Sequence, residues 1–147
     1  MITVHFETLG CKLNQIETES ICKAFSDYGW NIDVKPITSS SELTEEQKNE
    51  TKICVVNTCT VTTKAEQKCR HSINLLLKTF PFAFIIVTGC YAQVEKPQIE
   101  KISPRIVVIP GMKKSLIAEL PLHLNFLFDK NENLEKIVLL VNDLEEN

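Results

Sequence analysis

The order of elements along the chain constrains the fold more than any other feature, because a strand-like apolar run, a turn and an amphipathic helix recur. The first apolar run covers residues 2–6, and a helix is predicted from about residue 14 to residue 28. Gly29 follows it as a stop signal. The spacing i, i+3, i+4, i+7 marks one buried helix face. The residues predicted on that face are Ile21, Ala24, Phe25 and Tyr28.

The same order recurs twice more. Residues 53–57 form an unbroken apolar run, typical of a strand covered on both faces. A helix is predicted from about Thr63 to Lys78, with a buried face of Ala65, Cys69, Ile73, Leu76 and Leu77. The third apolar run is 83–87, followed by a short helix at 97–102 in which Pro97 suits the first turn. The remaining predicted elements are a strand at 105–109, a helix at 113–120 and an additional short strand at 31–35.

Strands that alternate with helices predict a mainly parallel sheet with right-handed crossovers. The expected fold is therefore α/β, an open three-layer sandwich of the flavodoxin or Rossmann type. We expect one domain over residues 1–121. A polar stretch at 36–52 is interpreted as an exposed insertion loop. Residues 122–147 are expected to form a tail or helix of uncertain role that leads to a further domain missing from this chain.

Composition narrows the function classes. The chain has 147 residues, of which 44% are hydrophobic, and no apolar run approaches the ~18 residues that span a bilayer. Residues 1–6 show no basic segment and no cleavage site of a signal peptide, so a cytoplasmic protein is expected. The net charge of −3 argues against a domain that holds nucleic acid by bulk electrostatics.

Six cysteines are many for a cytoplasmic chain of this size. Stable disulfides are not expected in a reducing compartment, and no pair has the CxxC spacing of zinc ribbons or thioredoxin-like proteins. Cys54 falls in a predicted strand, Cys69 on a buried helix face and Cys22 beside one. These three are interpreted as core or near-core residues, because free cysteine behaves as a small hydrophobe.

Cys11, Cys59 and Cys90 are different, since each lies in the loop that follows the carboxyl end of a predicted strand. In an open α/β sheet these ends gather along one edge, where ligands bind. One cysteine in such a loop is usually there by chance, but three in three equivalent loops indicate a site for a soft metal. Three ligands suit a cluster or catalytic metal better than a closed zinc site. His5 or His71 would be a fourth ligand for zinc, although a structural role is favoured for both.

Three motifs resemble those of the N-terminal domain of radical-SAM methylthiotransferases. They are TLGCKLNQIE at 8–17, VVNTCTVT at 55–62 and TGCYAQ at 88–93, and their order and separation also match the family. The resemblance covers residues 1 to about 120. Within the family, the first two motifs look most like the branch that modifies threonylcarbamoyladenosine in tRNA, next to the anticodon.

The resemblance implies that Cys11, Cys59 and Cys90 bind an auxiliary [4Fe–4S] cluster in which one iron has no protein ligand (an open iron). In the family, this open iron is associated with sulfur delivery. The resemblance also implies a second [4Fe–4S] cluster and S-adenosylmethionine in a separate radical-SAM domain, with tRNA as substrate and a reductant and sulfur donor as partners. Asn14, Asn57 and Thr58 are candidates to support the ligand loops. Asn14 equally suits a helix N-cap. Four basic residues near the site face either RNA or only solvent: Lys12, Lys64, Lys68 and Arg70.

The chain departs from the family in one respect. The CxxxCxxC motif of the radical-SAM cluster is absent, and no cysteine follows Cys90. The chain is therefore either a degenerate protein or, as favoured here, a fragment. It is expected to have no catalytic residues of its own and no methylthiotransferase activity by itself. No fixed protein partner and no membrane is indicated.

Other interpretations stay open at this point. Within the family they are methylthiotransferases that act on isopentenyladenosine in tRNA or on a ribosomal protein. Outside it they are a non-enzymatic α/β module that binds zinc or a small ligand, and a structural domain whose cysteines are fortuitous. A phosphatase-type nucleophilic cysteine is disfavoured, because no glycine- and arginine-rich phosphate loop follows any of the three cysteines.

Overall fold

The computed structural model describes residues 3–9, 12–38, 40–58, 63–89, 92, 95–110 and 117–121, without the side chains of 12–14 and 110. Its five strands are all parallel and form one sheet in the order β2-β1-β3-β4-β5. The strands are β1 (Thr3–Thr8), β2 (Asn31–Asp33), β3 (Thr51–Thr58), β4 (Phe84–Gly89) and β5 (Ile106–Pro110). The helices are α1 (Lys12–Asp27), α2 (Glu45–Glu50), α3 (Thr63–Thr79) and α5 (Lys96–Glu100). The predicted parallel α/β sandwich is confirmed.

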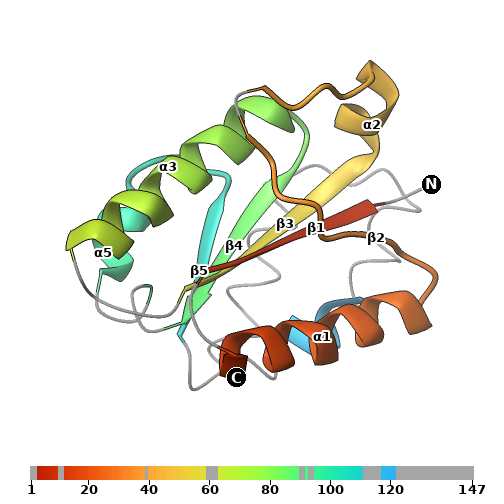
Figure 1. Ribbon diagram of the computed structural model, residues 1–147, viewed down its shortest axis with the longest axis horizontal. Helices are drawn as coiled ribbons and strands as arrows, with labels where there is room; N and C mark the ends of the chain where they lie inside the picture. The colour runs from red at the N-terminus through yellow and green to blue at the C-terminus, as the bar shows by residue number, and fades with distance from the viewer. Residues whose placement is uncertain are drawn as a thin grey trace.

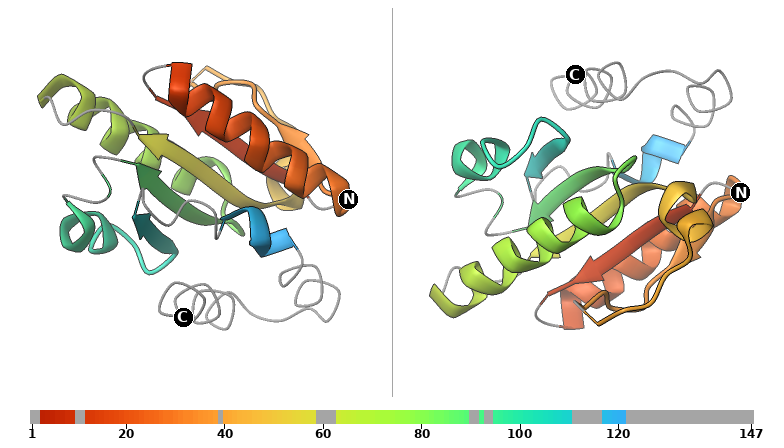
Figure 2. Two further views of the ribbon diagram at one scale, coloured as in Figure 1. Left: turned by 90° about the horizontal axis from the view of Figure 1, so that it is seen from below. Right: turned by 90° about the horizontal axis from the view of Figure 1, so that it is seen from above.

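Helices cover both faces of the sheet (Figure 1). Helix α1 and the helical turn at 117–121 lie on one face, and α3 and α5 lie on the other, as the two views of Figure 2 show. Alternate residues of each strand pack against the two layers. On the α1 face the core includes Val4, Phe6, Phe25, Val55, Ile86 and Ile117. On the α3 face it includes Cys54, Val56, Cys69, Ile73, Val87 and Ile99.

The end of α1 corrects one predicted contact. The Trp30 N–H donates to the Phe25 carbonyl and the Gly29 N–H to the Ser26 carbonyl, a pattern that closes a helix around a residue of positive φ. Gly29 supplies that residue with φ +87°. Tyr28 was predicted on the buried face but is 46% exposed, because the helix ends at Asp27 and its periodicity no longer applies.

The polar stretch at 36–52 is largely exposed, as predicted, but describing it as a loop was wrong for its second half. Residues 45–50 form α2, and Thr51 and Lys52 already belong to β3. The Thr44 hydroxyl accepts from the Gln47 N–H, and the Gln47 side chain accepts from the Thr44 N–H. This reciprocal capping box stabilises a short helix in a segment whose composition alone suggests none. The domain boundary at residue 121 and a role for 122–147 stay predictions, since 122–147 lie outside the described residues.

Arg105 ties the end of α3 to the start of β4. Its guanidinium donates to the carbonyls of Leu77 at 2.6 Å and of Phe80 and Ala83 at 2.8 Å each. Carbonyls at a helix C-terminus lack partners within the helix, and a cation there also offsets the helix dipole.

We expect Arg105→Met to lower the free energy of unfolding by about 2–4 kcal/mol, because three half-buried carbonyls lose a charged donor. Urea denaturation measures the effect. Lys101→Met is the control, since Lys101 is exposed just after α5. Equal stabilities of the two variants would show that the guanidinium contacts do not stabilise the fold.

Within the ranges described here, no helix has the length and hydrophobicity to cross a bilayer.

Candidate metal-binding edge of the sheet

The three strands that precede the predicted ligand cysteines are neighbours in the sheet. β3 lies between β1 and β4, and the last residues of the three strands are in register. Asn57 pairs with Thr8 on one side and Thr88 on the other, and the Leu9 N–H donates to the Asn57 carbonyl at 2.8 Å. Adjacent strands are about 4.8 Å apart, so the three strand ends lie within about 10 Å.

Cys11, Cys59 and Cys90 themselves lie outside the described residues, as does the side chain of Asn14. Their assignment as ligands stays a prediction. Residues beside them are described: Thr58 directly precedes Cys59, and Gly89 directly precedes Cys90. Thr58 and Gly89 are register partners on adjacent strands. The chain therefore leaves the sheet toward positions 59 and 90 from neighbouring points of one edge.

Gly89 allows β3 and β4 to approach closely at this edge. Its φ is +105°, and a Cβ placed on it would lie 2.0 Å from the carbonyl oxygen of Thr58 and 2.5 Å from the Thr58 hydroxyl. That hydroxyl donates to the Thr88 carbonyl at 2.7 Å. Any side chain at position 89 would have to separate the two strand ends. Gly89 is thus required for the spacing of the edge that carries two of the three cysteines.

A row of polar side chains replaces the apolar core at the same end of the sheet, on the α1 face. Thr18 of α1 is buried and accepts hydrogen bonds from the Thr8 hydroxyl at 2.8 Å and from the Asn57 amide nitrogen at 3.2 Å. Thr88 completes the row as the register partner of Asn57. Its hydroxyl is fully buried and has no hydrogen-bond partner in the part of the chain that the structure describes.

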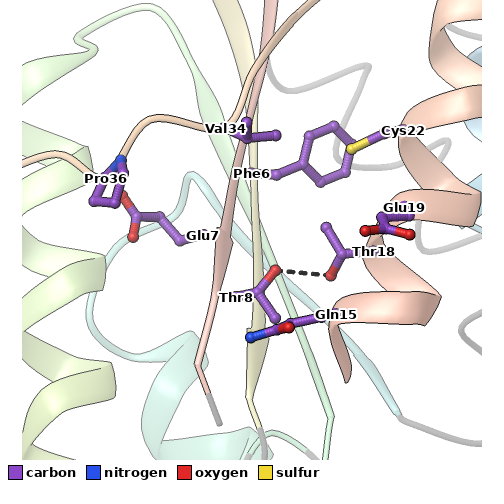
Figure 3. A pocket seen from close by; sticks show the side chains of 9 residues that line it. All are labelled: Phe6, Glu7, Thr8, Gln15, Thr18, Glu19, Cys22, Val34 and Pro36. Carbon is purple, nitrogen blue, oxygen red and sulfur yellow. Dashed lines mark hydrogen bonds between the residues drawn. The ribbon is translucent and has the colours of Figure 1, made fainter. Parts of the chain in front are cut away.

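A cavity of about 300 Å³ opens beside this row, between β1, α1 and the segment after β2. Figure 3 shows Thr8 and Thr18 joined across it, with Phe6, Cys22 and Val34 at its apolar end. It exists because β2 pairs only with residues 3–5 of β1, which leaves the carboxyl half of β1 uncovered by a strand on this side.

The other three cysteines are core residues, as predicted. Cys54 and Cys69 are buried, and Cys22 is half-buried against the α1-face core. Burial raises the pKa of Cys22 to about 11 and that of Cys69 to about 12, and it raises the pKa of Cys54 well above its usual value. All three therefore stay protonated at neutral pH, and a thiol is a poor metal ligand compared with a thiolate.

His5 is unsuited to complete a metal site. It is fully buried within β1, with Nε2 2.9 Å from Glu7 Oε1 and Nδ1 3.2 Å from Asp33 Oδ2. Both ring nitrogens therefore lie within ion-pair distance of a carboxylate, and Glu7 Oε1 also accepts from the Ile37 N–H. His71 is exposed on α3. Among the described residues no three His, Cys, Asp or Glu side chains form a group that could hold a metal ion.

The His5 cluster makes the stability of the fold depend on pH. Burial lowers the pKa of His5, but hydrogen bonds to Asp33 and Glu7 and the charges of both carboxylates outweigh it, so the pKa lies above 6.5. The hydrogen bond from His5 in turn holds the pKa of Asp33 below 3.8. The His5 contribution is fully present below pH 6.5 and is lost as pH rises through the folded pKa. The Asp33 contribution is present above pH 3.8 and is lost as pH falls through its lowered folded pKa.

We therefore expect the stability that wild type holds over His5→Gln to be largest between pH 3.8 and 6.5. The difference in stability between wild type and His5→Gln should be smaller at about pH 9 than at about pH 6. The decrease should be about 1.4 kcal/mol for each unit by which the folded pKa of His5 exceeds 6.5. Urea denaturation at the two pH values measures it, with His71→Gln as the exposed control. A difference that does not change with pH would contradict the ion-pair account.

Several residues of this edge have no clear signal in the sequence. Thr18 and Thr88 look like ordinary polar positions, and only the register of the strands and the packing of α1 on them bring both residues to one row with Asn57. The basic residues Lys64, Lys68 and Arg70 are exposed on α3, and Arg70 bonds Glu66 and Gln98 at 3.2 Å each. The contacts of Arg70 favour the interpretation of a solvated helix surface over that of an RNA contact.

Known proteins match the chain over the same region. The model of the family described as "Uncharacterized protein family UPF0004" matches residues 3–111. A threonylcarbamoyladenosine tRNA methylthiotransferase MtaB of Treponema pallidum is 42% identical over 121 residues, which are 82% of this chain and 23% of that protein. MtaB of Bacillus subtilis is 35% identical over 111 residues, 76% of this chain and 22% of that protein.

A relative that is named for a different substrate also matches. The ribosomal protein uS12 methylthiotransferase RimO of Caldicellulosiruptor saccharolyticus is 31% identical over 121 residues, 79% of this chain and 24% of that protein. The chain thus spans about a quarter of the length of these curated relatives.

Proposed function

Because the chain belongs to the family described as uncharacterized protein family UPF0004, we propose that it is the N-terminal, cluster-binding domain of a methylthiotransferase that modifies threonylcarbamoyladenosine in tRNA. The resemblance to methylthiotransferases seen in the three motifs is confirmed by its relatives. The two most similar relatives reported above are named for this tRNA substrate, which supports the tRNA branch over the ribosomal one. Since tRNA is the proposed substrate, the proposed location is the cytoplasm.

The observation that carries the cluster proposal is the meeting of three strand ends, each followed closely by a cysteine. Cys11, Cys59 and Cys90 would hold a [4Fe–4S] cluster as thiolates. The donor set fits, since soft thiolates from separate loops suit iron–sulfur clusters. One further feature fits: the buried Thr88 hydroxyl has no hydrogen-bond partner among the described residues. With three protein ligands, such a cluster would supply one iron at which a sulfur species can bind.

The described residues would serve this site by holding the ligand loops in place. Gly89 sets the distance between the strands that precede Cys59 and Cys90. The Asn57 side chain bonds to Thr18, and the Thr58 hydroxyl bonds to the Thr88 carbonyl. These two contacts would hold the end of β3 in place before Cys59.

The other parts of the reaction would come from elsewhere in a longer protein. This sequence has no CxxxCxxC motif to hold the second cluster that cleaves S-adenosylmethionine. We therefore expect the 147-residue chain alone, with S-adenosylmethionine, a reductant and tRNA, to form no methylthiolated nucleoside.

A chimera tests the proposed function. In it, residues 3–111 of this chain replace the matching segment of the Treponema pallidum relative, in bacteria that lack their own enzyme. Mass spectrometry of tRNA nucleosides should then detect methylthiolated threonylcarbamoyladenosine, and a chimera with Cys59→Ala should not produce it. A chimera that instead modifies ribosomal protein uS12 would move the proposal to the ribosomal branch. A chimera that folds and binds iron but modifies neither would contradict it.

A further inference from the structure

The Thr88 hydroxyl is one of a few buried side-chain atoms that lack a hydrogen-bond partner among the described residues. Thr88 is 0% exposed, and in the part of the chain described here its Oγ1 has no hydrogen-bond partner. Leaving a buried hydroxyl without a partner costs about 1–3 kcal/mol, and valine would fill the same volume at no such cost. A hydroxyl in this place indicates a partner beyond the described residues.

The position of Thr88 limits what that partner is. It is the register partner of Asn57 and the penultimate residue of β4, two positions before Cys90. On its other side it pairs with Ile109, an apolar residue of the same face. The Thr18 hydroxyl of the same polar row already accepts from Thr8 and Asn57. The unused donor therefore lies at the carboxyl edge of the sheet, where the three cysteines follow.

We propose that Thr88 is a positioning residue whose hydroxyl donates a hydrogen bond to a sulfur atom of the iron–sulfur site at this edge, and that Thr18 orients Asn57 for the same purpose. This inference rests on the proposed function, because it requires the cluster. A sulfur that receives a hydrogen bond carries less negative charge toward iron, so the reduced cluster is stabilised. Hydrogen bonds to the sulfurs are one of the features that set the reduction potential of such clusters.

The test uses the 147-residue chain, reconstituted anaerobically with iron and sulfide, and a redox titration followed by visible absorption. In Thr88→Val we expect the equilibrium to shift about tenfold toward the oxidised cluster, which is about 59 mV for one electron. Thr88→Ser keeps a hydroxyl at this position and should restore most of the wild-type potential. Thr18→Val should shift the potential in the same direction, through the loss of the contact that holds Asn57.

Thr51→Val is the matched control. Thr51 is also buried, but at the opposite end of β3, and its hydroxyl donates to the Gln47 carbonyl at 3.1 Å. We expect Thr51→Val to lower the stability of the metal-free chain and leave the potential unchanged. Thr88→Val should do the reverse, with unchanged or higher stability of the metal-free chain, because no hydrogen bond within the described part is lost.

The outcomes separate this inference from the proposed function. A Thr88→Val cluster with the wild-type potential would overturn the inference alone, and so would a metal-free Thr88→Val chain that is destabilised as Thr51→Val is. A wild-type chain that takes up no iron would overturn the proposed function and this inference together.

Discussion

Replacing Gly89 by alanine is expected to lower the free energy of unfolding by about 3–5 kcal/mol, from the strain of a left-handed backbone and from overpacking. The added Cβ would lie 2.0 Å from the Thr58 carbonyl oxygen, which belongs to the backbone of a buried strand and cannot move aside as a flexible side chain can. β3 and β4 would have to separate at their carboxyl ends. Because Cys59 and Cys90 follow directly, the same change should also abolish iron uptake.

Gly29→Ala is the matched control for this prediction. Gly29 also has a positive φ, +87°, but an added Cβ meets no atom within 4 Å. We expect it to cost only the left-handed conformation, about 1–2 kcal/mol, and to leave iron uptake intact. Urea denaturation of the metal-free variants and iron analysis after reconstitution measure both effects. Equal costs at the two glycines would show that the close approach of β3 and β4 does not matter.

Single replacement of Cys11, Cys59 or Cys90 by alanine is expected to remove most of the bound iron. We expect reconstituted wild type to hold about four irons per chain, with a broad absorption band in the blue-violet. Two thiolates cannot hold a cluster of this size against loss to solution, so each variant should keep less than about a tenth of the iron. Iron and sulfide analysis with visible absorption measures the loss.

Cys22→Ala is the control for these variants. Cys22 lies on α1 with its thiol half-buried against the core, and burial raises the pKa of this thiol to about 11. The variant should therefore keep the full iron content. If all the variants stay colourless together with wild type, the three cysteines hold no cluster. If Cys22→Ala loses iron as the others do, the loss reflects damage to the fold and not a missing ligand.

Periodicity and local signals were enough to predict the elements that position the site. The unbroken apolar run around Val55 predicted a strand buried on both faces, and β3 is such a strand. Gly29 predicted the end of the first helix, and the backbone closes around it there. Alternation of strands and helices was sufficient to predict a parallel sheet, since only that arrangement connects such elements with short right-handed crossovers.

Features that depend on the alignment of distant strands could not be predicted. Thr18, Asn57 and Thr88 form one row because β3 and β4 are in register and α1 packs on this face of the sheet, and no local pattern encodes that alignment. The ends of β3 and β4 were underestimated, since Thr58, Thr88 and Gly89 looked like turn residues but belong to strands. Helix α2 was missed because composition outweighed the capping signal at Thr44.

The most direct test of the central claim is Mössbauer spectroscopy of the wild-type chain reconstituted with isotopically enriched iron, before and after addition of a small thiol. Three cysteine ligands predict a [4Fe–4S] cluster in which the thiol changes the signal of about one iron in four, the iron without a protein ligand. The same treatment of Cys22→Ala should give the same spectra. A chain that binds no iron, or a cluster whose irons all ignore the thiol, would contradict a three-cysteine site with an open iron.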